Sequence, residues 1–175
     1  TGTTGTTGTT GTTGTTGGLM VGVHQALTAG FPNAILGYTG DSLGYGYYID
    51  GTKYNNAASG TAYGSAYTTN DVIGVALDMS SGTASLTFYK NGVSQGVAYS
   101  SLAGDYIAAL SCASPSTAAI NFGQRPFAYT PPTGFKALHT GNLPDAVIKL
   151  PAQYMAATTY TGTNASLTIS NAVNG

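Results

Sequence analysis

The chain has 175 residues, which suits one domain with a single hydrophobic core. Only 6% of the residues are charged, where an average domain has about a quarter, and the formal net charge is −1. This balance excludes the basic patch that binds nucleic acid and the cationic surface that binds anionic membranes, and no apolar run reaches the roughly 18 residues of a membrane-spanning helix.

Residues 1–18, TGTTGTTGTTGTTGTTGG, repeat threonine and glycine in triplets. A collagen-like helix is disfavoured because no proline stiffens the triplets. A flexible linker fits the absence of apolar residues. A β-strand fits the preference of threonine for strands, although a period of three does not keep glycine on one face of a strand. The strand position ranks first, the linker second and the collagen-like helix third, for a reason given by the rest of the chain.

The segment from residue 19 to residue 56 predicts three strands. LMVGV (19–23) is an apolar run of strand length, and FPNAILGYTGD (31–41) predicts a loop because proline and glycine interrupt it. GYGYYIDGTKYNN (44–56) predicts a hairpin. Its turn is Asp50-Gly51, a preferred pair for a tight type I′ turn.

The next segment contains the clearest strand signals. Residues 56–70 are small and polar, which predicts a loop with a weak edge strand. DVIGVALDM (71–79) is rich in β-branched and apolar residues and predicts a strand. ASLTFYKNGVSQGVAY (84–99) predicts a hairpin over Asn91-Gly92, the strongest short-range hairpin signal in the chain.

Two further strands are predicted at residues 106–114 and 117–124, and the proline-rich segment 125–135 then ends regular structure. No stretch shows a helical period with capping residues. Short strands at close spacing with turn signals between them are typical of an antiparallel β-sandwich. The predicted fold class is therefore all-β.

The segments DVIGVALDM, LTFYKNGVSQGVAY and AAINFGQRPFAYTPPTGFKAL, in this order and spacing, resemble the core of a SPRY (B30.2-like) domain. The match extends over residues 19–143 and is closest to the version found in bacteriophage virion proteins. The resemblance implies a bent β-sandwich of two antiparallel sheets that binds through loops at one edge and is not an enzyme. Members of this group usually carry an aromatic-rich strand before the LMVGV-like strand. The repeat stands in that place, so a strand position is expected there.

The resemblance also suggests how the chain is divided. We expect the repeat, residues 1–18, at a strand position of the sandwich, and the SPRY-like sandwich itself at residues 19–141. Residues 142–157 are expected to be a proline-punctuated linker. Residues 158–175 resemble the start of a further β module in phage structural proteins. The chain does not begin with Met, so we expect a piece of a longer or processed polypeptide.

The sequence gives little support for catalysis or metal binding. All six acidic residues are aspartates, mostly at turns or strand ends, whereas glycoside hydrolysis needs two carboxylates about 5–10 Å apart. Two distant histidines and one cysteine form no ligand cluster, and calcium at Asp41 or Asp50 is a minority interpretation. Cys112 is expected to pack as a small hydrophobe. We therefore expect no catalytic residue, no metal site and no cofactor.

Two loops, residues 31–43 and 54–68, are the candidates for recognition. They are neutral and rich in tyrosine, asparagine and serine, like antibody paratopes, in which tyrosine supplies contact area at low entropic cost. The alternative is that Tyr54 and Tyr63 are core or edge residues of the sandwich. The candidate ligand-binding residues are Tyr38, Tyr54, Asn55, Asn56, Tyr63 and Tyr67.

The resemblance implies a non-catalytic component of a bacteriophage virion, in a tail fibre, a neck fibre or a capsid decoration. The expected partners are neighbouring virion subunits or a host-surface glycan, with no nucleic acid and no membrane, and the expected location is the virion. A homo-oligomer is expected, a trimer by analogy with phage fibres. Two alternatives stay open: a structural β-sandwich spacer without a ligand, and a hydrolase of host polysaccharide.

Overall fold

The computed structural model describes residues 5–12, 18–26, 35–80, 84–113 and 116–142. The chain divides into two compact units, Thr1–Asn142 and Leu143–Gly175, and all described residues belong to the first. The β module expected at 158–175 lies outside the described residues. The same holds for the expected linker, 142–157, from residue 143 onward. Within the described ranges, no helix is long and apolar enough to cross a membrane.

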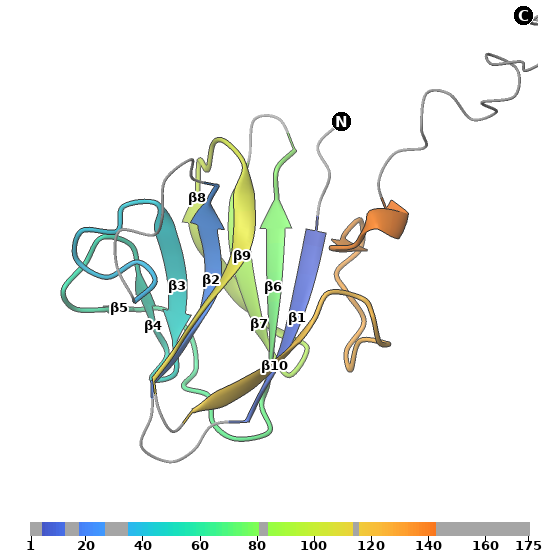
Figure 1. Ribbon diagram of the computed structural model, residues 1–175, viewed down its shortest axis with the longest axis horizontal. Helices are drawn as coiled ribbons and strands as arrows, with labels where there is room; N and C mark the ends of the chain where they lie inside the picture. Colours follow the sequence, from blue (N-terminus) through green and yellow to red (C-terminus); the bar gives the residue numbers. More distant parts are fainter. Residues whose placement is uncertain (1–4, 13–17, 27–34, 81–83, 114–115, 143–175) are drawn as a thin grey trace, which may run out of the picture. The chain divides into compact units, whose positions relative to one another are not determined.

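The described residues form two β-sheets (Figure 1). The first has the strand order β10-β1-β6-β7-β8, with β11 beside β1, and the second has the order β5-β4-β3-β2-β9. The strands of the first sheet are β1 (Gly5–Thr12), β6 (Val72–Asp78), β7 (Ser85–Lys90), β8 (Val93–Ser100), β10 (Thr117–Asn121) and β11 (Lys136–Ala137). Those of the second are β2 (Leu19–Gln25), β3 (Gly44–Tyr48), β4 (Thr52–Tyr54), β5 (Thr61–Ala62) and β9 (Tyr106–Cys112).

All pairings between these strands are antiparallel except that of β11 with β1. The described residues contain no α-helix, and their one helical segment is the 3-10 turn η1 (Thr140–Asn142). This architecture confirms the predicted all-β fold class.

The hydrophobic core lies between the two sheets. Side chains alternate between the faces of a strand, so every second residue of β2 points to the same side. The core side chains from the second sheet meet those from β6, β7 and β8 of the first sheet. The members of this cluster on these strands are Leu19, Val21, Val23, Tyr47, Ile73, Val75, Leu86, Phe88 and Ala98.

The two predicted hairpins are present, but only one has the predicted turn. Asn91 and Gly92 both have positive φ, at 51° and 81°, as a type I′ turn requires. In the hairpin between β3 and β4 only Gly51 is left-handed, at 94°, and its amide donates to the carbonyl oxygen of Tyr48 at 3.0 Å. The prediction of a type I′ turn at Asp50-Gly51 is therefore wrong. The turn begins at Tyr48 and ends on the glycine, as in longer hairpin loops.

Part of the threonine–glycine repeat, Gly5–Thr12, is strand β1. It lies between β10 and β6 and pairs antiparallel with both, with Thr9 opposite Ile73 and Thr7 opposite Val75. Backbone groups supply the hydrogen bonds of a sheet, so a strand with two neighbours can form without a continuous apolar face.

Candidate binding site on the outer face of the five-stranded sheet

The second sheet has a face that points away from the core, which we call the outer face. On β2 the alternation places Leu19, Val21 and Val23 toward the core, and Met20 and His24 on the outer face. The register carries this face to the neighbouring strands, because Met20 lies opposite Tyr48 of β3 and opposite Ser111 of β9. Tyr54 of β4 shares it, since that residue lies opposite Gly46.

A loop, residues 35–43, lies against this outer face. Leu36 is buried, its amide donates to the hydroxyl of Ser111 at 2.8 Å, and three glycines of β2 and β3 leave room for it. A Cβ atom added at Gly22 would lie 3.0 Å from Cδ2 of Leu36, and one added at Gly44 would lie 2.6 Å from the amide nitrogen of Gly37. The glycines therefore leave space for this loop, and a larger residue at Gly22 or Gly44 would displace it.

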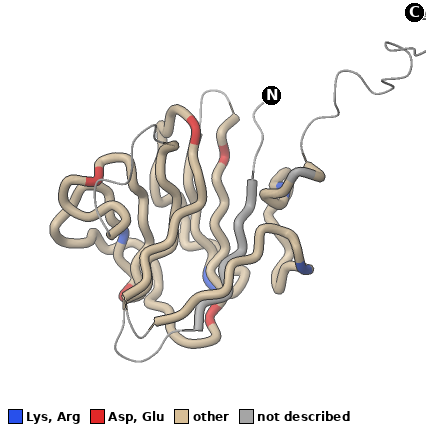
Figure 2. Tube along the Cα trace, in the orientation of Figure 1, with Lys and Arg blue, Asp and Glu red and all other residues tan. Residues whose placement is uncertain are grey.

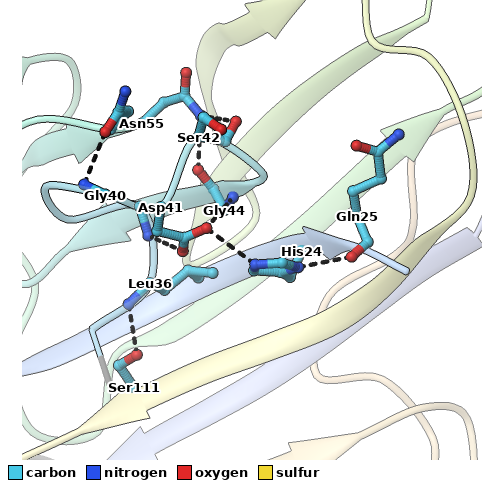
Figure 3. A network of polar contacts seen from close by, with 11 residues as sticks. His24, Gln25, Leu36, Gly40, Asp41, Ser42, Gly44, Asn55 and Ser111 are labelled. Carbon is cyan, nitrogen blue, oxygen red and sulfur yellow. Dashed lines mark hydrogen bonds and ion pairs between the residues drawn. The ribbon is translucent and has the colours of Figure 1, made fainter. Parts of the chain in front are cut away.

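A buried carboxylate holds the loop in place (Figure 3). Asp41, 1% exposed, accepts the amide of Gly37 at 2.8 Å through Oδ2 and the amide of Gly44 at 2.9 Å through Oδ1. Its Oδ1 also lies 3.0 Å from Nε2 of His24, which is fully buried. Nδ1 of His24 lies 2.7 Å from the carbonyl oxygen of Gln25. The calcium role considered for Asp41 has no support in this geometry, because two amides and an imidazole surround the carboxylate.

Asn55 and Asn56 fasten the other side of the loop. Nδ2 of Asn55 donates to the carbonyl oxygens of Ser42, at 3.0 Å, and Gly44, at 2.8 Å. Oδ1 of Asn56 accepts the amide of Gly40 at 2.8 Å, and its own backbone is left-handed, with a φ of 50°. Both residues were predicted to contact ligand; in the structure their amides shape the loop.

Tyr38 and Tyr54 lie together at the surface. Their ring centroids are 6.4 Å apart, and the ring of Tyr54 is 5.9 Å from that of Tyr48. Tyr38 is exposed, whereas Tyr54 and Tyr48 are half-buried. The three rings therefore form a row that leads from the loop onto the sheet. The sequence predicted Tyr38 and Tyr54 as ligand contacts but did not single out Tyr48.

A cavity of about 320 Å³ lies beside Tyr48. No charged side chain lines it, and Ile35, at one side, is 44% exposed although it is a large apolar residue. Small-molecule pockets in proteins measure about 300–1,000 Å³ and are mostly apolar, with a few polar groups. The lining residues are Gly18, Met20, Ile35, Tyr48, Ser111, Cys112 and Ala113.

Cys112 is exposed, which corrects the prediction that it packs as a small hydrophobe. It is the last residue of the edge strand β9, and its thiol donates to the carbonyl oxygen of Ser116 at 2.8 Å. The small apolar residues around it in the sequence suggested burial. The end of an edge strand, however, has a neighbour on one side only, which leaves its side chains open.

Of the remaining two predicted contact residues, Tyr67 is buried in the core and Tyr63 is partly buried against it. Tyr67 is 4% exposed, and its hydroxyl lies 2.8 Å from the carbonyl oxygens of both Leu19 and Tyr47. The hydroxyl of Tyr63 donates to the carbonyl oxygen of Gly96 at 2.5 Å. Burial raises the pKa of both phenols, because the charged form loses its hydration. The structure thus separates this pair from Tyr38 and Tyr54.

The described residues offer little for metal or acid–base chemistry. They contain no group of three or more His, Cys, Asp or Glu side chains that could hold a metal ion. The charged residues are few and scattered over the chain (Figure 2), although Lys90 and Asp71 form an ion pair at 3.3 Å. Asp50, considered for calcium, accepts the amide of Thr52 at 2.9 Å and its hydroxyl at 2.6 Å. Another hollow, bounded by Tyr89, Tyr129 and Pro131, measures about 50 Å³, which is room for a few water molecules only.

The features that sequence reasoning missed are the cavity and the His24–Asp41 contact. His24 and Asp41 are 17 residues apart, and neither belongs to a motif. The available signal was a polar residue at an alternate position of an apolar strand, LMVGVHQ, which has to find a partner if it is buried. The residues of the cavity come from β2, β3, β9 and the loop, so only the register brings them together.

Comparisons of the sequence and of the structure with known proteins both find SPRY domains. The SPRY domain model matches residues 9–125. A crystal structure of a human SPRY domain superposes with a TM-score of 0.56 at 21% sequence identity, covering 70% of this chain and 78% of the other. At that identity the likeness supports the fold alone.

Curated relatives include the Ran-binding proteins 9/10 homolog of Drosophila melanogaster and Ran-binding protein 9 of Homo sapiens, each 34% identical over 91 residues. Ran-binding protein 10 of Danio rerio is 35% identical over the same length. The match covers 51% of this chain but only 9%, 12% and 15% of these three proteins. The chain therefore corresponds to one part of much longer relatives.

Proposed function

The chain belongs to the SPRY domain family, whose members are binding modules, and we propose that it binds an uncharged protein segment by seating one apolar side chain in the cavity beside Tyr48. The observation that carries this proposal is the cavity itself, which has about 320 Å³ of space and no charged wall. Interfaces gain most of their energy where aromatic and apolar side chains fill such pockets, with charged residues depleted at the centre.

The surroundings of the cavity fit a protein segment. Met20 at its wall has an adaptable side chain, and methionine is common at surfaces that accept apolar groups. Ile35 and Tyr38 remain partly exposed and can be covered by a ligand, which would gain about 25 cal/mol for each Å² of apolar surface removed from water. The hydroxyl of Ser111 and nearby backbone groups can fix the orientation of the segment.

We propose that the module is not catalytic. SPRY domains are typically non-catalytic interaction modules, and the carboxylates closest to the site are engaged. Asp41 is surrounded by two amides and His24. A reacting group would need a base within hydrogen-bond reach, and the walls of the cavity provide none among the described residues.

A glycan is the second candidate ligand, favoured by the pair of rings at Tyr38 and Tyr54. Their planes are inclined by 32°, and the outer ring is exposed, so a neutral sugar could stack on it. This ligand would use the row of tyrosines and not the cavity.

The place of this module in a bacteriophage virion, with neighbouring virion subunits or a host glycan as partners, remains a proposal that rests on the sequence resemblance alone. The relatives named above are animal proteins. The proposed binding mode needs only the cavity, so it holds for a virion protein or for any other parent protein. A trimer remains an expectation by analogy.

Selection of random displayed peptides against the chain tests the proposed function. We expect the chain to select uncharged peptides with one large apolar residue. Substitution Ile35→Ser should weaken these peptides about tenfold, which corresponds to about 1.4 kcal/mol. Val97→Ser is the matched control, because Val97 is 59% exposed on β8, away from the cavity.

Failure to select any peptide, or equal binding by Ile35→Ser and Val97→Ser, would refute the cavity as a peptide site. A glycan array run in parallel separates the second candidate. Glycan binding that Tyr38→Ala abolishes and Ile35→Ser leaves unchanged would replace the peptide by a sugar as the ligand.

A further inference from the structure

We propose that His24 and Asp41 are positioning residues of the binding site: their buried contact holds the 35–43 loop on the outer face and so places Ile35 at the cavity and Tyr38 beside Tyr54. This inference rests on the proposed function. It concerns a pair of residues that makes no contact with ligand itself.

The buried contact between His24 and Asp41 is costly unless every polar group in it has a partner. His24 is 0% exposed and Asp41 is 1% exposed, so both polar groups have lost their hydration. A carboxylate in such a place is tolerated only when its oxygens are paired and hydrogen-bonded. Asp41 meets this condition with the amides of Gly37 and Gly44 as donors and with Nε2 of His24 at 3.0 Å, which donates in the tautomer that carries its proton there.

The imidazole of His24 is held in a fixed orientation. Nδ1 lies 2.7 Å from the carbonyl oxygen of Gln25, and Nε2 lies 3.0 Å from Oδ1 of Asp41, so each nitrogen has an acceptor beside it. A ring fixed at both ends cannot rotate without losing a contact. His24 is therefore held in one orientation near the end of β2, where it contacts the loop.

The two amides bound by Asp41 enclose most of the loop between them. Gly37 follows the buried Leu36, and Gly44 begins β3, so the carboxylate closes residues 37–44 into a compact turn. Gly37 has a φ of 68°, a conformation that other residues rarely adopt, and its carbonyl oxygen accepts the amide of Ala57 at 3.2 Å. Removing the carboxylate would release both ends at once.

The anchored residues of the loop position two exposed side chains of the proposed site. Ile35 precedes Leu36, which is fixed by Ser111, and Tyr38 follows Gly37, which is fixed by Asp41. Both exposed side chains of the proposed site are thus one residue away from an anchored position. A shift of the loop would move them together, and a displacement of about 1 Å is enough to weaken a binding contact substantially.

The variants His24→Leu and His24→Gln test this inference in the full chain. Leucine fills a similar space without a donor, whereas the amide of glutamine can still donate to Asp41. Two quantities are measured: hydrogen exchange at the amides of Gly37 and Gly44, and the Kd of a displayed peptide that the wild type selects through Ile35. For His24→Leu we expect exchange and Kd each to rise about tenfold, and for His24→Gln both to return to within about threefold of wild type.

Val75→Ala is the control for a general loss of stability. Val75 lies in the core between the sheets, so its truncation should lower stability while leaving the Kd of the peptide within about twofold. A simple structural role of His24 would instead make His24→Leu behave like Val75→Ala.

The failure of this inference is distinguishable from that of the proposed function. An unchanged Kd in His24→Leu, or equal weakening by His24→Leu and His24→Gln, overturns the positioning role while the peptide site stands. If the wild type selects no peptide that depends on Ile35, the proposed function fails and the inference falls with it.

Discussion

Two tyrosine-rich segments of this molecule place tyrosines differently. Residues 35–56 place Tyr38 and Tyr54 on the outer face of the second sheet, while residues 61–67 bury Tyr67 in the core and pack Tyr63, which is partly buried, against it. Both segments are rich in tyrosine and contain glycine and small polar residues. Composition therefore identifies neither segment as a binding surface.

The hydrogen bonds of each segment explain why its tyrosines are exposed or buried. The 35–43 loop satisfies its own polar groups through Asp41, Asn55 and Asn56, so Tyr38 is not needed for that purpose. The tyrosines of the second segment are engaged with other strands: the hydroxyl of Tyr67 lies 2.8 Å from the carbonyl oxygens of Leu19 and Tyr47, and that of Tyr63 donates to the carbonyl oxygen of Gly96. A tyrosine is available to a ligand where other groups have already satisfied the backbone.

Among the substitutions that test this contrast, Tyr67→Ala should lower the free energy of unfolding most. Its ring packs 5.1 Å from that of Tyr47 in the core, and its removal leaves a cavity and two carbonyl oxygens without this donor. We expect a loss of about 3–5 kcal/mol in the free energy of unfolding, measured by chemical denaturation. A loss below about 1 kcal/mol would show that Tyr67 is not a core residue.

Tyr67→Phe separates the ring from the hydroxyl. The ring stays, but the carbonyl oxygens of Leu19 and Tyr47 lose a buried donor, so we expect a loss of about 1–3 kcal/mol. The same denaturation experiment measures it. Equal stability of Tyr67→Phe and wild type would mean that the hydroxyl bonds do not fix this segment.

Alkaline pH should affect the interior tyrosines. Burial, followed by the nearby Tyr63 and Asp71, raises the pKa of Tyr47 to about 12 from an ordinary value of 10.0. A raised pKa favours the neutral phenol in the folded state, so its contribution is complete below about pH 10 and is lost as the pH rises toward 12.

The free energy of unfolding, measured from pH 9 to pH 12, should therefore decline over this range. In Tyr47→Phe the decline should be shallower, because one titrating phenol is gone, while other buried tyrosines such as Tyr67 and Tyr99 still contribute. An identical slope in wild type and variant would contradict the placement of Tyr47 in the core.

Tyr38→Ala should have the smallest effect on stability. The side chain is exposed, and its ring centroid lies 6.4 Å from that of Tyr54. We expect a change within about 0.5 kcal/mol, as for most surface substitutions, together with weaker binding of a selected ligand. A change in stability like that of Tyr67→Ala would erase the contrast between the two segments.

The fold class could be predicted from the sequence because the patterns that specify its strands and turns are local. The Asn91-Gly92 turn and the apolar run of β6 each specify their structure within a few residues. The Asp50-Gly51 turn was predicted as the wrong type because the same dipeptide also fits a longer loop that ends on a left-handed glycine.

The site was less accessible because it depends on contacts between distant segments. The register of β2 with β3 and β9 puts Met20, Tyr48 and Ser111 together, and a shift by one residue would move each to the other face. The contact between His24 and Asp41 forms only when the loop folds back over the sheet. No local pattern encodes either arrangement.

The most direct test of the central claim is a map of backbone amide shifts when an isotope-labelled chain is titrated with a selected peptide. The proposed site predicts that the largest changes lie at Met20, Ile35, Tyr48 and Cys112, with the amides of Tyr63 and Tyr67 little affected. Changes centred on Tyr63 and Tyr67, or on Val97 of β8, with none around the cavity, would contradict it.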